Sequence, residues 1–269
     1  MTDRIIPSLP ATESNRIQMK SHIDFNCDLG EGVGEDAAIL PFISSASIAC
    51  GFHAGSPELM RETVKLCGEH GVAIGAHPSF ADRENFGRSA QSISPAAAYA
   101  LTLYQIGALD AFVRAAGLRL NHVKPHGAFY NQAARDRELA DAIATSVRDY
   151  DPGLILYGLA GSVLIDAGTA LGLQVAHEAF AERRYEADAT LTPRSRGDAS
   201  LDDPADAASQ AISLLRDGEV IARTGERLAL RADSLCLHGD RPDAVAFARE
   251  LRSAIEKSGF HIQAPERHR

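Results

Sequence analysis

One pattern recurs along the chain from residue 22 onward: a short apolar run, a turn that contains Gly or His, and an amphipathic stretch. About seven such units follow one another, and short strands alternating with helices form parallel sheets through right-handed crossovers. The sequence therefore predicts an α/β fold, and a single parallel (β/α)7-type barrel fits better than two domains. An open doubly wound sheet is the alternative that periodicity leaves open. The apolar runs are IDFNC (23–27), ASIAC (46–50), VAIGA (72–76), LNHVK (120–124), LILYG (154–158), LQVAH (173–177) and SLCLH (234–238).

The runs read as apolar along their length, which is typical of strands covered on both faces. Between them, Ser56 with Pro57 and Ser94 with Pro95 are expected to start helices, and Gly117 is expected to end one. The expected helical stretches are 57–70, 94–117, 132–150, 161–172, 204–218 and 241–259.

Composition excludes several classes of protein. Hydrophobic residues make up 45% of 269 residues, which is ample for a core, and no apolar run approaches the roughly 18 residues of a membrane span. Lys and Arg total 27 against 36 Asp and Glu, a net charge of −9. An acidic chain has no general attraction for nucleic acid or anionic lipid, so neither is expected as a partner.

We expect three parts: a flexible leader over 1–21, a barrel over 22–260 and a C-terminal tail over 261–269. The leader has no continuous apolar segment of the kind that a secretory signal needs, so a cytoplasmic protein is expected. The four cysteines form no CxxC pair and are expected to be reduced core thiols; they are Cys27, Cys50, Cys67 and Cys236.

Polar residues gather where the apolar runs end, and six of the ten histidines lie there. In parallel α/β folds these strand ends meet at one face, where reactive residues are normally found. This clustering indicates an enzyme without indicating the reaction. The strand-end residues include Asp28, Glu31, His53, His77, His122, Lys124, His126, His177, Glu178, Glu182, Arg183, His238 and Asp240.

The fourth run, NHVKPHG, carries the strongest signal. His122, Lys124 and His126 are spaced by two, so a pleated strand directs all three to one face. A lysine inside a barrel is costly unless it meets a carboxylate or an anionic ligand. The alternative to a functional role is a buried ion pair of Lys124 with Asp28 or Asp240.

Other chemistries have weaker support. Asp28, His53, His77 and His126 are suitable ligand types for a divalent metal, with Asp28, His53 and His77 as the leading candidates, but no HExxH motif fixes a geometry. There is no GxSxG elbow, GxxxxGK[ST] loop or GxGxxG fingerprint. Arg83, in the loop after the third run, could clamp a carboxylate, and a solvated loop held by salt bridges is the alternative.

Seven motifs occur in an order that resembles the LamB/YcsF family over about residues 22–259. They are DFNCDLGEG (24–32), IACGFHAGSP (48–57), GVAIGAHPSFADRENFGR (71–88), HVKPHGAFYNQA (122–133), GLAGS (158–162), EAFAERRY (178–185) and CLHGD (236–240). The resemblance implies a divergent (β/α)7 barrel related to glycoside hydrolases and deacetylases. It also implies ATP-dependent opening of 5-oxo-L-proline to L-glutamate with two partner subunits, B and C (PxpB and PxpC). ATP is thus an implied co-substrate whose binding site is not assigned to this chain or to a partner.

Two positions depart from the family pattern. Glu182 stands where the family usually has Asp, and Ala189 follows Asp188 where a glycine is common. Both lie in the segment that leads to LTPRSRG (191–197), so no substrate contact of the family is carried over to that segment.

Ring opening of an activated lactam needs a cation for developing negative charge, a base for water and a clamp for the substrate carboxylate. We assign Lys124 to anion stabilisation, Asp28 and His77 to base work or metal binding, His126 to proton transfer and Arg83 to the carboxylate. Further substrate contacts are expected from Glu31, His53, Asn85, His238 and Asp240.

Three rival functions remain open at this point. They are an ATP-independent, metal-dependent deacetylase or amidohydrolase, a Schiff-base lyase that uses Lys124, and a non-catalytic carrier of 5-oxoproline.

Overall fold

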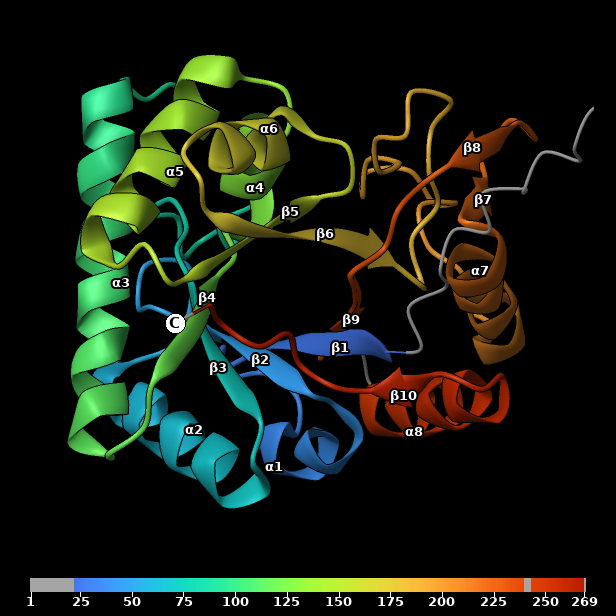
Figure 1. The fold of residues 1–269 in the computed structure, drawn as a ribbon, viewed down its shortest axis with the longest axis horizontal. Helices are drawn as coiled ribbons and strands as arrows, with labels where there is room; N and C mark the ends of the chain where they lie inside the picture. The colour runs from blue at the N-terminus through green and yellow to red at the C-terminus, as the bar shows by residue number, and fades with distance from the viewer. Residues whose placement is uncertain (1–21, 240–242, 269) are drawn as a thin grey trace, which may run out of the picture.

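The computed structural model describes residues 22–239 and 243–268, in which seven parallel strands close into a barrel in the order β1-β2-β3-β4-β5-β6-β9 (Figure 1). The barrel closes because β9 pairs with both β6 and β1. Each of the seven barrel strands begins within one residue of its predicted apolar run, so the predicted barrel is confirmed. The barrel strands are β1 (His22–Leu29), β2 (Ser45–Ala49), β3 (Ala73–His77), β4 (Leu120–Val123), β5 (Ile155–Leu159), β6 (Gln174–Phe180) and β9 (Ser234–His238).

Helices surround the barrel, with α2 to α6 on one side and α7 and α8 on the other (Figure 1). As predicted, the hydroxyls of Ser56 and Ser94 accept hydrogen bonds from the first turns of α2 and α3. The stretch predicted as one helix over 132–150 is instead two, because Asp136 accepts a hydrogen bond from Leu139 N and starts a new helix. The helices are α1 (Asp36–Ile39), the 3-10 helix η1 (Leu40–Phe42), α2 (Pro57–His70), α3 (Pro95–Ala115), α4 (Gly127–Ala133), α5 (Arg137–Tyr150), α6 (Val163–Ala170), α7 (Pro204–Asp217) and α8 (Ala244–Lys257).

The interior of the barrel is polar along β1, contrary to the prediction of strands that are apolar on both faces, whereas Ile155, Tyr157 and Ala176 of β5 and β6 form a small buried apolar cluster of their own. In β1 the alternate residues Asp24, Asn26 and Asp28 are all buried and bond to side chains of other barrel strands. The residues between them, such as Phe25 and Cys27, belong to the hydrophobic core. Because successive strand residues point to opposite faces, the apolar face packs against the helices and the polar face fills the barrel.

The segment predicted as a C-terminal tail packs against the barrel. It forms β10 (His261–Ile262), which pairs with β1, and Arg267 donates hydrogen bonds to the carbonyls of Leu120 and Gly153. The barrel body therefore extends beyond residue 260. A two-stranded hairpin, β7 (Glu219–Ile221) and β8 (Arg227–Ala229), lies beside α7 (Figure 1). The predicted leader, 1–21, lies outside the described residues.

Helix α3 is, by length and composition, the one described helix that could cross a membrane. Its buried residues Ile106, Leu109 and Val113 belong to the hydrophobic core, and the helix packs against α5 and β3. These contacts give it the role of a barrel-covering helix in this fold. The cytoplasmic location stays a prediction, whereas the four cysteines are free and buried as expected.

Candidate active site at the carboxyl ends of the barrel strands

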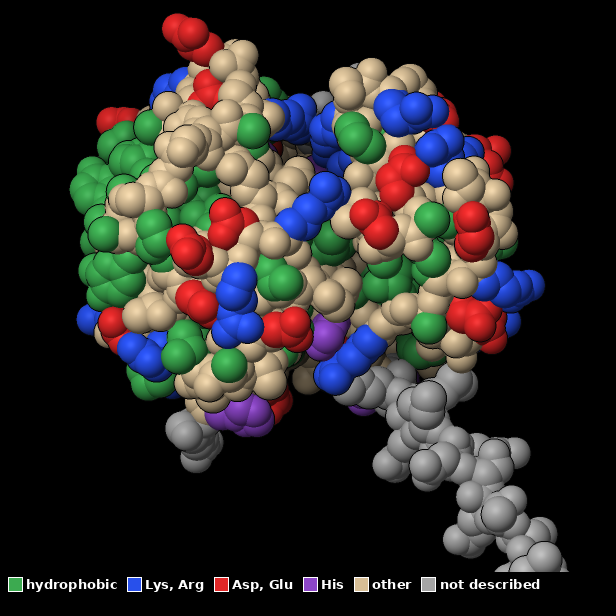
Figure 2. Space-filling view, turned by 90° about the horizontal axis from the view of Figure 1, so that it is seen from above, with side chains coloured by type: hydrophobic (Ala, Val, Ile, Leu, Met, Phe, Trp, Pro, Cys, Tyr) green, Lys and Arg blue, Asp and Glu red, His purple; other side chains and the backbone are tan. Residues whose placement is uncertain are grey.

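A cavity of about 780 Å³ opens at the carboxyl ends of the barrel strands. Five predicted residues from four strands and their loops line it together: Asp28, His77, Lys124, His126 and His238. On the face drawn in Figure 2 the surface is hollowed, and Lys and Arg side chains gather along the hollow. The strand ends thus converge on one mouth, as parallel barrels require.

Lys124 lies at the centre of the cavity floor, directly after β4, and is only 2% exposed. Its Nζ lies 2.6 Å from Asp28 Oδ1 and 2.9 Å from Glu178 Oε1, and it donates a hydrogen bond of 2.6 Å to Asn26 Oδ1. The buried ion pair considered as the alternative for Lys124 is therefore present with Asp28, and it also faces the cavity. Glu178, from β6, is a site residue that the sequence assignment missed, although it was noted at a strand end.

The charges of Lys124 and its carboxylate partners determine which of these side chains are ionised. Burial alone would lower the pKa of Lys124, but the Asp28 carboxylate, with Cys236 and Glu178, outweighs it and raises that pKa well above its usual value. Burial alone would raise the pKa of Asp28, but His77 and Lys124 hold it well below its usual range. At neutral pH the floor of the cavity therefore carries an ammonium group and an ionised Asp28.

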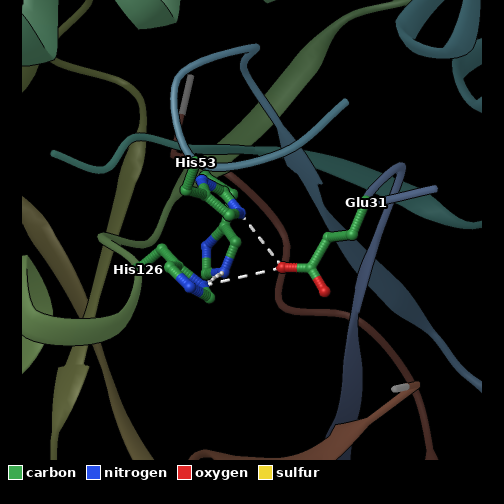
Figure 3. Close-up of side chains that lie close together, drawn as sticks. Glu31, His53 and His126 are labelled. Carbon is green, nitrogen blue, oxygen red and sulfur yellow. Dashed lines mark hydrogen bonds and ion pairs between the residues drawn. The ribbon is translucent and has the colours of Figure 1, made fainter. Parts of the chain in front are cut away.

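Three imidazoles and a carboxylate form a second group beside this ion pair, which we call the histidine cluster: Glu31, His53, His77 and His126 (Figure 3). His53 Nε2 lies 3.0 Å from Glu31 Oε1, and the rings of His53 and His126 stack with centroids 3.8 Å apart. His126 Nδ1 lies 2.9 Å from His77 Nε2. The cluster joins the ion pair through His77, whose Nε2 lies 3.3 Å from Asp28 Oδ2.

The loop after β3 approaches the cluster closely enough that one position must be glycine. Gly87 has a φ of +67°, and a Cβ there would lie 2.8 Å from His53 Cβ and 2.9 Å from His126 Cδ2. A side chain at Gly87 would therefore push both imidazoles out of place.

The opposite side of the mouth carries His238 and a buried arginine. His238 Nδ1 forms a short hydrogen bond with Glu182, one of the two residues that depart from the family pattern. Arg183 is 6% exposed, and its guanidinium donates to the carbonyls of Thr192 and Ala199. Burial, with the nearby Arg194, lowers the pKa of Arg183 to about 10, so it remains charged at neutral pH. Arg183 and Arg194, which lie on one loop, both line the cavity.

Of the predicted substrate contacts, Glu31 and His53 belong to the histidine cluster beside the cavity and do not themselves line it, and two more, Arg83 and Asn85, lie outside both the cavity lining and the cluster. Arg83 is exposed and donates hydrogen bonds to the carbonyls of Gly51 and Gly55, so its guanidinium holds two loops together instead of facing the cavity. Asn85 is exposed and donates to Asp82 within its own loop. The alternative interpretation of the loop after β3, an exposed loop held by its own polar contacts, therefore describes the structure better than a carboxylate clamp. Asp240 lies outside the described residues.

Comparison with known proteins decides the family. A family model described as the LamB/YcsF family matches residues 23–269. The chain belongs to the LamB/YcsF family. The resemblance inferred from the motifs is therefore confirmed.

Relatives within the LamB/YcsF family are similar over nearly their whole length. The chain is 53% identical over 251 residues to the 5-oxoprolinase A subunit of Bordetella parapertussis, a match that covers 91% of this chain and 100% of that protein. It is 50% identical over 247 residues to the 5-oxoprolinase A subunit of Bacillus subtilis, covering 90% and 96%. The crystal structure of a lactam utilization protein from Thermus thermophilus matches with a TM-score of 0.85 at 47% identity, covering 91% and 100%.

Proposed function

We propose that this chain is the A subunit of an ATP-dependent 5-oxoprolinase, which opens the lactam ring of 5-oxo-L-proline to L-glutamate. The names of its relatives support the substrate and the role as one subunit of several. The observation that carries the catalytic part is the buried Lys124, which is paired with Asp28 and Glu178 at the floor of a cavity large enough for substrate.

The proposed reaction begins with activation of the lactam, because an amide is a poor electrophile. Transfer of the terminal phosphoryl group of ATP to the amide oxygen gives an imidate-like phosphate and ADP. Water then adds to that carbon, the ring C–N bond breaks, and the nitrogen takes up a proton. The remaining acyl phosphate is hydrolysed by a second water to glutamate and inorganic phosphate.

Each step has a candidate group in this chain. The Lys124 ammonium is suited to stabilise negative charge on the phosphorylated oxygen or on the tetrahedral intermediate. Asp28 is ionised and lies between Lys124 and His77, so it is suited to accept a proton from the attacking water. The histidine cluster, which includes His126, is suited to supply the proton that the ring nitrogen takes up.

For the substrate carboxylate we now propose Arg183 in place of Arg83, because Arg183 is buried, charged and lines the cavity. A guanidinium can hold a carboxylate through two parallel hydrogen bonds, and Arg194 adds positive charge nearby. The test is Arg183→Lys, with Arg83→Lys as the matched control. We expect KM for 5-oxoproline to rise about tenfold or more in the first variant and to stay unchanged in the second. An unchanged KM in Arg183→Lys would reject this assignment.

Two of the rival functions can be weighed against the site. The Schiff-base lyase needs a neutral amine, and the ion pairs of Lys124 favour its charged form. The ATP-independent amidohydrolase is the second candidate function, because the histidine cluster gathers four side chains, three imidazoles and one carboxylate, that are suited to a metal. Dependence on ATP separates it from the first proposal.

The deciding experiment measures glutamate release from 5-oxoproline with and without ATP, first by this chain alone and then with subunits B and C (PxpB and PxpC). We expect release only with ATP and with all three subunits, since ATP binding is assigned to no residue of this chain. Release by the isolated chain without ATP would favour the amidohydrolase. The carrier is tested by single-turnover hydrolysis of a pre-activated lactam, which a non-catalytic protein cannot perform.

A further inference from the structure

The hydrogen positions in the histidine cluster follow from two backbone carbonyls. His77 Nδ1 lies 2.7 Å from the carbonyl oxygen of Lys124, and His126 Nε2 lies 2.9 Å from the carbonyl oxygen of Phe86. A carbonyl oxygen can only accept, so His77 Nδ1 and His126 Nε2 must each carry a hydrogen. In the neutral imidazoles the remaining nitrogens, His77 Nε2 and His126 Nδ1, then carry lone pairs.

These two lone pairs face each other. His77 Nε2 and His126 Nδ1 are only 2.9 Å apart, a distance at which two acceptors with no hydrogen between them repel. The arrangement is stable only if a cation lies between or beside them, and the candidates are a proton and a metal ion.

Two further atoms of ligand type, Glu31 Oε1 and His53 Nε2, lie close to this pair. Glu31 Oε1 lies 3.6 Å from His126 Nδ1 and 3.0 Å from His53 Nε2, and one ligand atom of each cluster residue lies within 4.8 Å of the others. Ligands at about 2.0–2.2 Å from one metal ion lie about 3–4.4 Å from each other, which these separations approach closely. A proton between His77 Nε2 and His126 Nδ1 accounts for that pair alone, while His53 Nε2 and Glu31 Oε1 form a separate hydrogen bond; one metal ion would account for all four atoms at once.

We propose that Glu31, His53, His77 and His126 bind one divalent transition-metal ion, such as Zn²⁺. Three imidazoles and one carboxylate suit a first-row metal such as zinc, nickel or iron, and Mg²⁺ or Ca²⁺ prefer oxygen ligands. The sequence named His53, His77 and His126 among the suitable ligand types; the revision is that Glu31 replaces Asp28 as the carboxylate ligand.

Metal binding needs the imidazoles in their neutral form, so the ion would displace any proton that the cluster holds. A second group of ligand types, Asp28, Cys236 and His238, also lies close together. It is the weaker candidate, because Asp28 is paired with Lys124 and His238 is bonded to Glu182.

The backbone around the cluster holds the ligands in one orientation. The carbonyl that fixes His126 belongs to Phe86, which has a φ of 56°, a left-handed conformation rarely adopted by residues other than glycine. Such strain persists only where the surroundings enforce it and is frequent at functional sites. Carbonyls that bind the second nitrogen of a metal-ligating histidine set its tautomer, and both His77 and His126 have one.

The ion would lie beside the catalytic floor. His77 and His126 line the cavity, and Asp28 Oδ2 lies 3.3 Å from His77 Nε2, so Asp28 is placed to accept a hydrogen bond from water on the ion. A bound metal lowers the pKa of its water, which would supply the attacking hydroxide. This catalytic role rests on the proposed function, whereas binding itself does not.

The test is metal binding to the isolated full-length chain after treatment with a chelator, using Zn²⁺ in titration calorimetry and Co²⁺ in visible spectroscopy. We expect one equivalent per chain and a Co²⁺ spectrum of nitrogen and oxygen ligation. Glu31→Gln and His53→Gln should each weaken Zn²⁺ binding by more than about tenfold. His238→Gln removes a cavity histidine outside the cluster and should leave Zn²⁺ affinity unchanged. Circular dichroism checks that each variant is folded.

Several results would overturn the proposal: no stoichiometric Zn²⁺ binding by folded wild-type protein, or equal affinity in His53→Gln and His238→Gln. Full ring-opening activity of metal-free protein in the presence of chelator would reject the catalytic role of the metal and leave the proposed function intact. One equivalent of metal, lost in the cluster variants, would support the site even if the assembled subunits open no lactam, and that outcome contradicts only the proposed function.

Discussion

Two buried aspartates on β1, four residues apart and on the same inward face, have opposite surroundings. Among the described residues, the hydrogen-bond donors to Asp24 are hydroxyl groups, those of Ser44, Ser45, Tyr157 and Ser234. Asp28 pairs with the Lys124 ammonium and contacts His77. We call the first group the hydroxyl layer and the second, with Glu178, the charged layer.

The comparison separates a structural use of buried charge from a functional one. In the hydroxyl layer the carboxylate is satisfied by neutral donors that belong to the barrel wall, and Asp24 does not belong to the described residues that line the cavity. In the charged layer Asp28, Lys124 and Glu178 all line the cavity, where a ligand can exchange for one of their contacts. Burying ion pairs is costly, so a charged layer beside a cavity indicates chemistry more than stability.

The largest expected effect is in the charged layer. Lys124→Met should reduce glutamate release by the assembled subunits by about a thousandfold or more, because it removes the cation that stabilises developing negative charge. It also leaves Asp28 and Glu178 buried without their partner, which should cost about 3–5 kcal/mol of unfolding free energy. Near-normal glutamate release by this variant would show that the charged layer is only structural.

A second variant separates lost catalysis from lost folding. Lys124→Met combined with Glu178→Gln restores the net charge of the layer, so urea unfolding should show much of the stability recovered. Activity should stay absent, because the ammonium group is still missing. Recovery of activity together with stability would contradict the role of Lys124.

The hydroxyl layer should give the opposite result. Tyr157→Phe removes a hydroxyl that donates a hydrogen bond of 3.0 Å to Asp24 Oδ2. The loss of a hydrogen bond to a charged acceptor should lower the unfolding free energy by about 1.5–3 kcal/mol. Activity per folded molecule should not change, since Tyr157 does not belong to the described residues that line the cavity. Urea unfolding and glutamate release measured on the same preparation test both parts, and a large loss of activity would break the distinction between the layers.

The sequence predicted the barrel well, because each barrel strand begins at a local apolar run and tertiary packing did not shift these starts by more than one residue. It predicted the convergence of Asp28, His77, Lys124, His126 and His238 for a general reason: parallel strands bring their carboxyl ends to one mouth. The polar interior was not predicted, since the residues inside β1 alternate with apolar ones and a run such as IDFNC reads as apolar overall.

Partners within the site were harder to predict than its location. Glu178 pairs with Lys124 across a sequence separation of 54 residues, and only the closed barrel brings β4 and β6 together inside. Arg83 and Arg183 both follow strand ends, and nothing in the sequence indicates which guanidinium faces the cavity. Hydrogen bonds to the Gly51 and Gly55 carbonyls, which decide the position of Arg83, depend on loop conformations that periodicity does not predict.

The pH dependence of stability offers a finer test of the hydroxyl layer. Burial raises the pKa of Asp24 in the folded state despite its hydrogen bonds from Ser234 and the other hydroxyls. The folded protein therefore holds this proton to higher pH than the unfolded chain, so the stability from Asp24 is present below about pH 4 and is lost as pH rises through the folded-state pKa. Asp24→Asn should remove this contribution, at most about 1.4 kcal/mol per pH unit. Unfolding free energies of both proteins from about pH 4 to 7 test this, and parallel curves would contradict the raised pKa.

The smallest expected effect concerns backbone strain in the loops around the cavity, next to the charged layer. Among the described residues, the two non-glycine residues with positive φ are Phe86 and Ala189, and both lie in loops next to the cavity.

Ala189 has a φ of 63° at the position where the family commonly has glycine, and its loop leads into Leu191 and Thr192 of the cavity wall. Ala189→Gly relieves the left-handed strain, offset in part by the greater freedom of glycine in the unfolded chain, so a gain of about 0.5–1 kcal/mol is expected. That gain should raise the melting temperature by about 1–3 °C. Ala187→Gly, in the same loop at a residue without positive φ, is the control and should be neutral or destabilising. Equal shifts of the melting temperature in the two variants would mean that the positive φ of Ala189 does not destabilise the folded protein. Phe86 would then be the one described residue that supports backbone strain at the mouth of the barrel.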